Sequence, residues 1–250
     1  MVDSSSEPLG SLVAGVELLS LDAGNTVIFL DHARIAAFVG ARGIEVTRET
    51  LVRCEGEAKR LLERGGGERS GWKYDREPGA KSWGKMLATM LVQAGVDREV
   101  VLPMLGPLWE HHMDFNLWWL VPQGLGPALD AVRAAGVNVV IVSNSEGKLD
   151  VLFERLAITG HFDLVVDSGK VGIEKPEPGI WQIALDAYPT LPERVLHLGD
   201  TYLTDIAGAN ALGYRSALID PYGHYEGWHS GVQRVPGVVE VANAISRRAR

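Results

Sequence analysis

The sequence predicts an α/β fold in which a doubly wound parallel sheet carries an inserted, all-helical cap. Three observations support this prediction. A short apolar segment at residues 16–21 ends in the turn signal Asp-Ala-Gly-Asn, as a buried strand does. From about residue 31 to 121 the apolar residues recur at helical spacing. After Pro122 strand-like and helix-like segments alternate, and this rhythm is typical of a parallel sheet with helices on both faces.

The individual elements follow in chain order. The first strand, 16–21, precedes helices expected at 32–41, 47–63, 82–94 and 98–115, the second of them opened by Thr47 as its N-cap. The second half is expected to contain helices at 127–135, 148–157, 177–187 and 205–212, and strands at 137–142, 164–166, 195–198 and 215–219. We therefore expect a core domain formed by residues 15–30 and 122–250, a cap domain formed by residues 31–121, and a flexible tail at residues 1–14.

Composition and charge restrict the class of protein. The 250 residues include 24 basic and 32 acidic side chains, a formal net charge of −8, which argues against a general nucleic-acid binder. Cys54 is the single cysteine and can form no intramolecular disulfide, which favours a cytoplasmic protein. No lysine or arginine precedes Arg34, which argues against a signal or transit peptide. Two acidic residues interrupt the most apolar stretch, which argues against a membrane span. We expect a monomer or homodimer that acts on a small molecule.

Polar residues follow the predicted strands at their carboxyl ends, where open parallel sheets bind ligands. Three carboxylates that lie close together raise one another's pKa unless a cation neutralises them, and ligands that offer only oxygen suit Mg²⁺. Mg²⁺ beside an ammonium group and backbone N–H groups can receive a phosphoryl group, and an aspartate there can attack phosphorus to form an aspartyl-phosphate. The residues concerned are Asp22, Ser143, Asn144, Lys175, Asp200 and Asp205.

Four segments, in this order, resemble the four motifs of the haloacid dehalogenase-like hydrolase superfamily. They are Leu-Leu-Ser-Leu-Asp-Ala-Gly-Asn-Thr-Val at 18–27, Val-Val-Ile-Val-Ser-Asn at 139–144, Gly-Ile-Glu-Lys-Pro-Glu-Pro-Gly-Ile-Trp at 172–181 and Leu-His-Leu-Gly-Asp-Thr-Tyr-Leu-Thr-Asp-Ile-Ala-Gly-Ala-Asn at 196–210. The resemblance covers residues 15–220. It implies a Rossmann-like core with a helical cap inserted after the first strand, in agreement with the pattern of elements.

The resemblance also implies a role for each motif residue. Asp22 is expected to be the nucleophile and a Mg²⁺ ligand, with Ser143 and Lys175 as its catalytic partners. The further metal ligands are expected to be the backbone carbonyl of Gly24 and the side chains of Asp200 and Asp205, the last supporting either the metal or the lysine. The phosphate group is expected to be bound by Thr26, Ser143, the backbone N–H of Asn144 and Lys175.

Gly24 departs from the pattern of the family's phosphatases. Those enzymes carry a second aspartate at this position, which protonates the leaving oxygen and then activates water. Glycine keeps the backbone carbonyl for a metal but has no proton to give, and Asn25 follows where glycine is usual. General acid–base catalysis is typically worth about 10²–10⁴-fold, so poor leaving groups should react slowly.

Three functions are compatible with this pattern. The first is a Mg²⁺-dependent phosphatase that is slow, acts on acyl or aryl phosphates, or uses a surrogate acid–base such as Asp31, His32 or a cap residue. The second is a hydrolase of C–P or C–X bonds: a phosphonatase would need a Schiff-base lysine in the cap, such as Lys59 or Lys85, whereas a dehalogenase would not need the acidic pair after the fourth strand. The third is a protein that binds a phosphorylated ligand without turnover.

Overall fold

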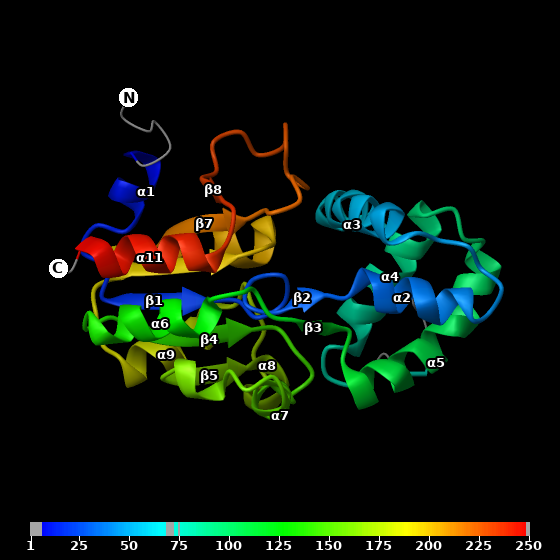
Figure 1. The fold of residues 1–250 in the computed structure, drawn as a ribbon, viewed down its shortest axis with the longest axis horizontal. Coiled ribbons are helices and arrows are strands. Elements are labelled where there is room, and N and C mark those ends of the chain that lie inside the picture. Colours follow the sequence, from blue (N-terminus) through cyan, green and yellow to red (C-terminus); the bar gives the residue numbers. More distant parts are fainter. Residues whose placement is uncertain (1–6, 69–72, 75, 249–250) are drawn as a thin grey trace. The chain divides into compact units, whose positions relative to one another are not determined.

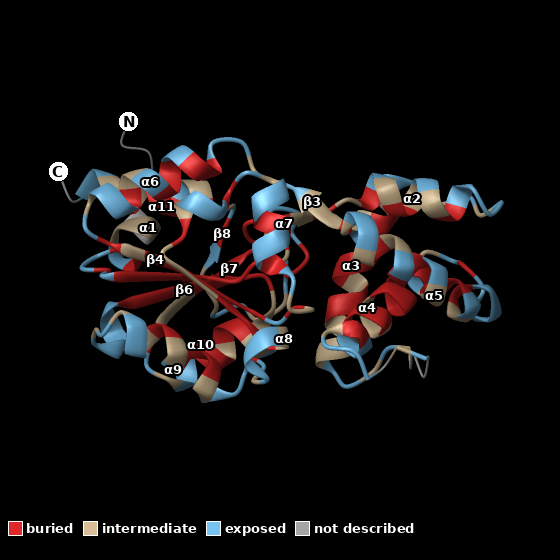
Figure 2. Ribbon diagram, turned by 90° about the horizontal axis from the view of Figure 1, so that it is seen from below, coloured by how far each residue is buried: buried red, intermediate tan, exposed pale blue. Residues whose placement is uncertain are grey.

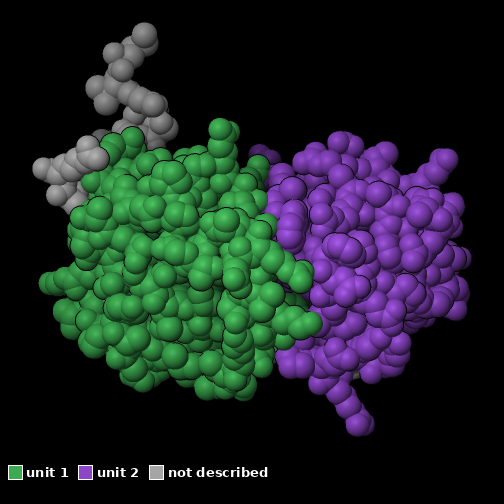
Figure 3. Space-filling view, turned by 60° about the horizontal axis from the view of Figure 1, so that its bottom comes forward, with its two compact units in different colours: residues 1–29, 121–221, 231–250 green, residues 30–120, 222–230 purple. Residues whose placement is uncertain are grey.

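The structure is a computed structural model that describes residues 7–68, 73–74 and 76–248. The chain divides into two compact units, coloured separately in Figure 3. The core unit contains residues 1–29, 121–221 and 231–250, and the cap unit contains residues 30–120 and 222–230. The sequence had placed 222–230 in the core domain, and this assignment was wrong, because the segment makes its contacts with a cap helix.

The core unit is built on a six-stranded sheet in the order β5-β4-β1-β6-β7-β8, and all its neighbouring strands run parallel. The first strand lies inside the sheet, and each of its four residues is buried, as expected for a strand covered on both faces. Six strands form the sheet: β1 (Leu18–Leu21), β4 (Asn138–Ser143), β5 (Leu164–Asp167), β6 (Val195–Gly199), β7 (Arg215–Ile219) and β8 (Arg234–Val235).

Helices cover both faces of this sheet. Figure 2 shows α6 and α11 on one face and α9 and α10 on the other, and the predicted α/β doubly wound fold is thereby confirmed. Figure 1 gives the order of the strands between them. The core helices are α1 (Glu7–Leu12), α6 (Leu125–Ala134), α7 (Leu149–Arg155), α8 (Ser168–Val171), α9 (Pro178–Ala187), α10 (Gly208–Ala211) and α11 (Val238–Arg248). Two 3-10 helices lie at Thr159–His161 and Pro192–Arg194, and a π-helix lies at Tyr202–Ala207.

The two ends of the core unit differ from the sequence prediction. Residues 7–12 form helix α1, and Leu12 and Val13 are buried, so the expected flexible tail is folded from residue 7 onward; residues 1–6 lie outside the described part. Helix α11 was not predicted, although its buried Val238, Val241 and Ile245 recur at helical spacing. Among the described residues, no helix has both the length and the apolar character that crossing a membrane requires.

The cap unit is helical, as predicted. Its helices are α2 (His32–Gly40), α3 (Arg48–Glu63), α4 (Ala80–Gln93) and α5 (Arg98–Phe115). Thr47 caps α3 by accepting a hydrogen bond from the backbone N–H of Thr50 at 3.1 Å. A buried apolar cluster that includes Leu87 and Trp109 forms the core of the unit. A short two-stranded sheet, β2 (Phe29–Leu30) with β3 (Trp118–Leu120), was not predicted.

The segment 222–230 is fastened to helix α3. The imidazole of His224 donates to the carbonyl oxygen of Val52 at 2.8 Å, and Arg60 donates to the carbonyl oxygen of His224 at 2.6 Å. The indole N–H of Trp228 donates to Glu63 at 3.3 Å. These bonds join residues more than 160 positions apart, which explains why no local pattern in the sequence indicated them.

Candidate active site

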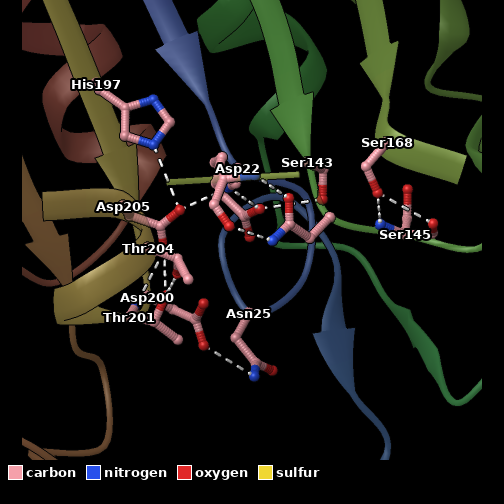
Figure 4. A network of polar contacts seen from close by, with 12 residues as sticks. Asp22, Asn25, Ser143, Ser145, Ser168, His197, Asp200, Thr201, Thr204 and Asp205 are labelled. Atoms are coloured by element: carbon pink, nitrogen blue, oxygen red, sulfur yellow. Dashed lines mark hydrogen bonds and ion pairs between the residues drawn. The ribbon is translucent and has the colours of Figure 1, made fainter. Parts of the chain in front are cut away.

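The carboxyl ends of three adjacent strands bring the first, second and fourth motifs together. Strand β1 lies between β4 and β6, with Leu21 in register with Ile141 on one side and Leu198 on the other. The backbone N–H of Asp22 donates to the carbonyl oxygen of Leu198 at 2.8 Å, which continues the pairing to the end of the strand. Figure 4 shows Asp22 close to Ser143 and Asp205, as expected for parallel strands that end at one edge.

Asp22 is held through one of its two carboxylate oxygens. Its Oδ1 lies 2.6 Å from Nζ of Lys175 and accepts a hydrogen bond from the hydroxyl of Ser143 at 3.0 Å. Both bonds end on Oδ1, so neither engages Oδ2. Lys175 of the third motif and Ser143 of the second motif therefore both contact Asp22 of the first motif. Neither of them occupies Oδ2 of Asp22, so this is the oxygen that can take part in a reaction.

Asp205 is occupied by contacts within the protein. Its Oδ1 lies 2.5 Å from Nζ of Lys175, and its Oδ2 accepts from the backbone N–H of Thr201 at 2.9 Å and from the Thr201 hydroxyl at 2.6 Å. Gly199 makes this approach possible, since a Cβ there would lie 2.3 Å from Cγ of Asp205. Of the two roles expected for Asp205, these contacts favour support of the lysine.

Asn25 reaches Asp200 from the loop after β1. Three successive backbone N–H groups, of residues 26–28, donate to the carbonyl oxygen of Ala23 and close this loop. Asn25 has a φ of +52°, a left-handed conformation that asparagine tolerates better than most residues. Its Nδ2 donates to Oδ2 of Asp200 at 3.2 Å. The substitution of asparagine for the usual glycine thus adds a contact to an expected metal ligand.

Thr26 is completely buried in the same loop. Its hydroxyl has no hydrogen-bond partner within the described part of the chain. An unsatisfied buried hydroxyl costs roughly 1–3 kcal/mol, and an oxygen of a bound ligand could satisfy it. The phosphate contact expected of Thr26 is compatible with this position and stays a prediction.

The buried charges of the site do not balance. Burial, together with Asp205 and Asp200, raises the pKa of Asp22 to about 7 against the opposing effect of Lys175. Burial lowers the pKa of Lys175, but the two neighbouring carboxylates outweigh it and hold that pKa above its usual range. Burial also raises the pKa of Asp205, but Lys175 and His197 outweigh it and keep that pKa well below its usual range. When all are ionised, three carboxylates face a single ammonium group.

This donor set fits a hard divalent cation. Mg²⁺ is usually bound through one or two protein carboxylates and keeps several waters, which Asp22 and Asp200 with the carbonyl of Gly24 would satisfy. Within the described ranges, no three acidic, histidine or cysteine side chains converge into a ready-made metal site.

Asn144 acts through a contact that the sequence did not indicate. Its side-chain Nδ2 donates to the carbonyl oxygen of Lys175 at 2.9 Å, and its Oδ1 accepts from the backbone N–H of Lys175 at 2.7 Å. The amide group therefore fixes the main chain of the lysine from both sides. The sequence had suggested only a backbone role for Asn144.

Sequence reasoning also missed His197 and Ser20. The Oγ of Ser20 and Nδ1 of His197 are 2.9 Å apart on neighbouring strands, and Nε2 of the imidazole lies 3.5 Å from Oδ1 of Asp205. Both residues are buried. A signal was present, because each is a polar residue inside an otherwise apolar strand.

The alternative acid–base and Schiff-base residues all lie in the cap unit. Asp31 caps helix α2 by accepting from the backbone N–H of Arg34 at 3.0 Å. The imidazole of His32 lies 2.7 Å from Glu55, and the ammonium group of Lys59 lies 3.0 Å from the same carboxylate. Lys85 is half-buried on α4. Asp31, His32 and Lys59 thus have hydrogen-bond or ion-pair partners inside the cap unit.

Comparison with known proteins identifies a family, and the matched range includes the second, third and fourth motifs. The family profile of haloacid dehalogenase-like hydrolases matches residues 34–213. The chain belongs to this family. The predicted resemblance is thereby confirmed, and the protein is a member of a hydrolase family.

Relatives of this hydrolase include a curated human protein and its mouse counterpart. Haloacid dehalogenase-like hydrolase domain-containing protein 3 of Homo sapiens is 30% identical over 213 residues, 82% of each chain. The mouse protein of the same name is 32% identical over 144 residues, so that match spans 56% of each chain, about half of its length. A phosphoserine phosphatase of Thermus thermophilus is 36% identical over 95 residues, 37% of each chain.

A solved structure of the family shows the same fold. HAD-hydrolase YfnB from Bacillus subtilis, bound to magnesium, superimposes with a TM-score of 0.62 at 14% identity. The comparison covers 92% of this chain and 98% of YfnB. At this identity the likeness establishes the fold of the haloacid dehalogenase-like hydrolase and nothing finer.

Proposed function

We propose that this hydrolase is a Mg²⁺-dependent phosphatase that acts on a small phosphorylated metabolite through an aspartyl-phosphate on Asp22. One observation carries the proposal: Lys175 and Ser143 both hold Oδ1 of the buried Asp22, so Oδ2 is left for attack. The phosphatase named among the relatives supports this substrate class. We further propose a cytoplasmic location, which the single cysteine supports, and a monomer or homodimer.

The reaction begins with attack by Oδ2 of Asp22 on phosphorus. A bond forms between Oδ2 and phosphorus while the bond to the leaving oxygen breaks, and that oxygen departs with the electron pair. Lys175 and the backbone N–H of Asn144 stabilise the negative charge on the phosphoryl oxygens. A bound Mg²⁺, held by Asp22, Asp200 and the carbonyl of Gly24, would supply further charge neutralisation.

Gly24 limits both halves of this reaction. The leaving oxygen needs a proton unless it is stable as an anion, and the water that hydrolyses the aspartyl-phosphate must lose one. Gly24 can provide neither function. The protein should therefore prefer acyl and aryl phosphates to alkyl phosphates. The absence of an acid–base side chain at Gly24 also favours a second candidate function, the binding of a phosphorylated ligand with little turnover.

A leaving-group series tests the proposal. The purified protein with Mg²⁺ is given aryl phosphates of increasing leaving-group pKa, an acyl phosphate and an alkyl phosphate. We expect phosphate release whose rate falls steeply as the leaving-group pKa rises, and no release by Asp22→Asn. The matched control is Asp186→Asn, at an exposed carboxylate hydrogen-bonded to Gln182 on helix α9. Release by Asp22→Asn at the wild-type rate would exclude Asp22 as the nucleophile.

A further inference from the structure

Asp167 is a buried carboxylate at the carboxyl end of β5, and the proposed reaction does not use it. Its side chain accepts four hydrogen bonds. They come from the Ser145 hydroxyl at 2.7 Å and from the backbone N–H groups of Gly147 at 3.0 Å, Leu149 at 3.1 Å and Gly169 at 3.0 Å. Three of these donors belong to the loop that follows Ser143.

Three of these four bonds end on Oδ1 of Asp167, and the fourth, from Leu149, ends on Oδ2. A buried carboxylate is tolerated when hydrogen bonds of this kind compensate for its lost hydration. All four donors are uncharged N–H and O–H groups. Asp167 therefore anchors the loop at residues 144–149.

A second pair of hydrogen bonds fixes Ser145, the residue that follows Asn144. The backbone N–H of Ser145 donates to the hydroxyl of Ser168 at 3.0 Å, and that hydroxyl donates to the carbonyl oxygen of Ser145 at 3.3 Å. Figure 4 shows Ser145 and Ser168 facing each other beyond Ser143. Because Ser143 is bonded to Asp22 on the other side, the peptide at Asn144 is fixed at both ends.

The short helix α8, which follows Asp167, is also in direct backbone contact with the loop at 144–149. A Cβ built on Gly169 would lie 2.4 Å from the backbone nitrogen of Gly147, and real Cβ atoms do not approach so closely. Movement of the turn after Asp167 would therefore displace the loop at 144–149. This packing is a second, independent constraint on the position of Asn144.

We propose that Asp167 is a positioning residue for phosphate binding: it holds the loop at 144–149 so that the backbone N–H of Asn144 points at a phosphoryl oxygen of the substrate. The inference rests on the proposed function, because it requires a phosphate at this end of the sheet. Asp167 itself touches neither substrate nor metal in this role.

Titration calorimetry with inorganic phosphate in the presence of Mg²⁺ tests this role. We expect Asp167→Asn to weaken phosphate binding about tenfold, since the amide has one acceptor oxygen and turns a donor toward other N–H groups. Its KM for an aryl phosphate should rise by a similar factor, whereas its affinity for Mg²⁺ should stay at the wild-type value. Ser145→Ala, which removes a single bond, should weaken phosphate binding about threefold and decides the question if Asp167→Asn does not fold.

The matched control is Asp163→Asn, at the other end of the same strand. Asp163 accepts from the backbone N–H of Val139 at 2.8 Å and from Arg133 at 2.8 Å, so its loss should lower the melting temperature without changing phosphate affinity. Equal phosphate affinity of the wild type, Asp167→Asn and Ser145→Ala would overturn the role of Asp167 and leave the phosphatase proposal standing. A wild type that binds no phosphate with Mg²⁺ would overturn both.

Discussion

The ammonium group of Lys175 lies 2.6 Å from Oδ1 of Asp22, and both side chains are buried in the core unit. The same nitrogen contacts Asp205, so one cation is shared by the carboxylate that follows β1 and a carboxylate in the π-helix after β6. This sharing explains how the carboxylate of Asp22, the proposed nucleophile, can be buried. It also makes the lysine the residue whose removal disturbs the site most.

Replacing Lys175 by methionine should abolish phosphate release and destabilise the protein. Breaking a buried ion pair by removing one partner typically costs about 3–5 kcal/mol, since it leaves a charge uncompensated. We expect a large fall in kcat and a lower urea midpoint for Lys175→Met. Lys170→Met is the matched control, because Lys170 pairs with Asp150 at the surface, where an ion pair is worth about 0–1 kcal/mol. Similar urea midpoints for the two variants would contradict this account.

Gly24→Asp should raise the turnover of alkyl phosphates. The new carboxyl group would supply the missing proton to the leaving oxygen, an effect of up to about 10²–10⁴-fold, and should change aryl phosphates much less. Steady-state kcat for one alkyl and one aryl phosphate gives the comparison. Gly24→Asn has similar size without an acid and should show no gain. A fall in kcat with aspartate would mean that another group already occupies that space.

The two acidic residues of the fourth motif should respond differently to mutation. Asp200→Asn should weaken Mg²⁺ binding at least about tenfold, because an amide replaces an ionised ligand. Asp205→Asn should have a smaller effect on Mg²⁺ affinity but a large effect on kcat, since Asp205 bonds to Lys175 and Thr201. Calorimetric titration of Mg²⁺ without substrate, beside steady-state kinetics, separates these effects. Equal losses of Mg²⁺ affinity would assign Asp205 to the metal.

The buried Glu55 should make the cap unit less stable in acid. Burial raises its pKa, but Lys59 and the hydrogen bond from His32 outweigh burial and lower the pKa from 4.5 to about 2. A carboxyl group whose pKa is lower in the folded than in the unfolded state stabilises the fold at pH values above its unfolded-state pKa. This contribution is lost as the pH falls from about 5 to 2. Glu55→Gln should therefore cost up to about 3 kcal/mol near pH 7, with the difference from wild type shrinking toward pH 2.

Urea unfolding between pH 7 and pH 3, followed by tryptophan fluorescence, measures this difference. Trp83 and Trp109 are buried in the cap unit and report on its unfolding. Glu57→Gln is the matched control, because Glu57 pairs with Arg53 near the surface and lies two residues further along the same helix. A pH-independent difference between Glu55→Gln and wild type would show that the ionised carboxylate does not stabilise the cap.

The sequence by itself determined the parallel sheet and the order of its motif residues. Apolar segments such as 18–21 and 139–142 are followed directly by Asp22 and Ser143. Parallel strands end at the same edge, so the pattern of strands was enough to predict that these residues meet. The family could be identified for the same reason, because each motif is a local run of residues.

Only the tertiary structure decided which side chains hold the site in place. The bonds of Asn144 to Lys175, of Asp167 to the loop at 144–149 and of His224 to helix α3 join residues that are far apart in the chain. Such bonds leave no periodic signal, since each depends on where two separate segments pack. The sequence placed 222–230 in the core domain because it follows a core strand, whereas its hydrogen bonds place it in the cap unit. The succession of strands along the chain follows from local pattern, but polar contacts follow from packing.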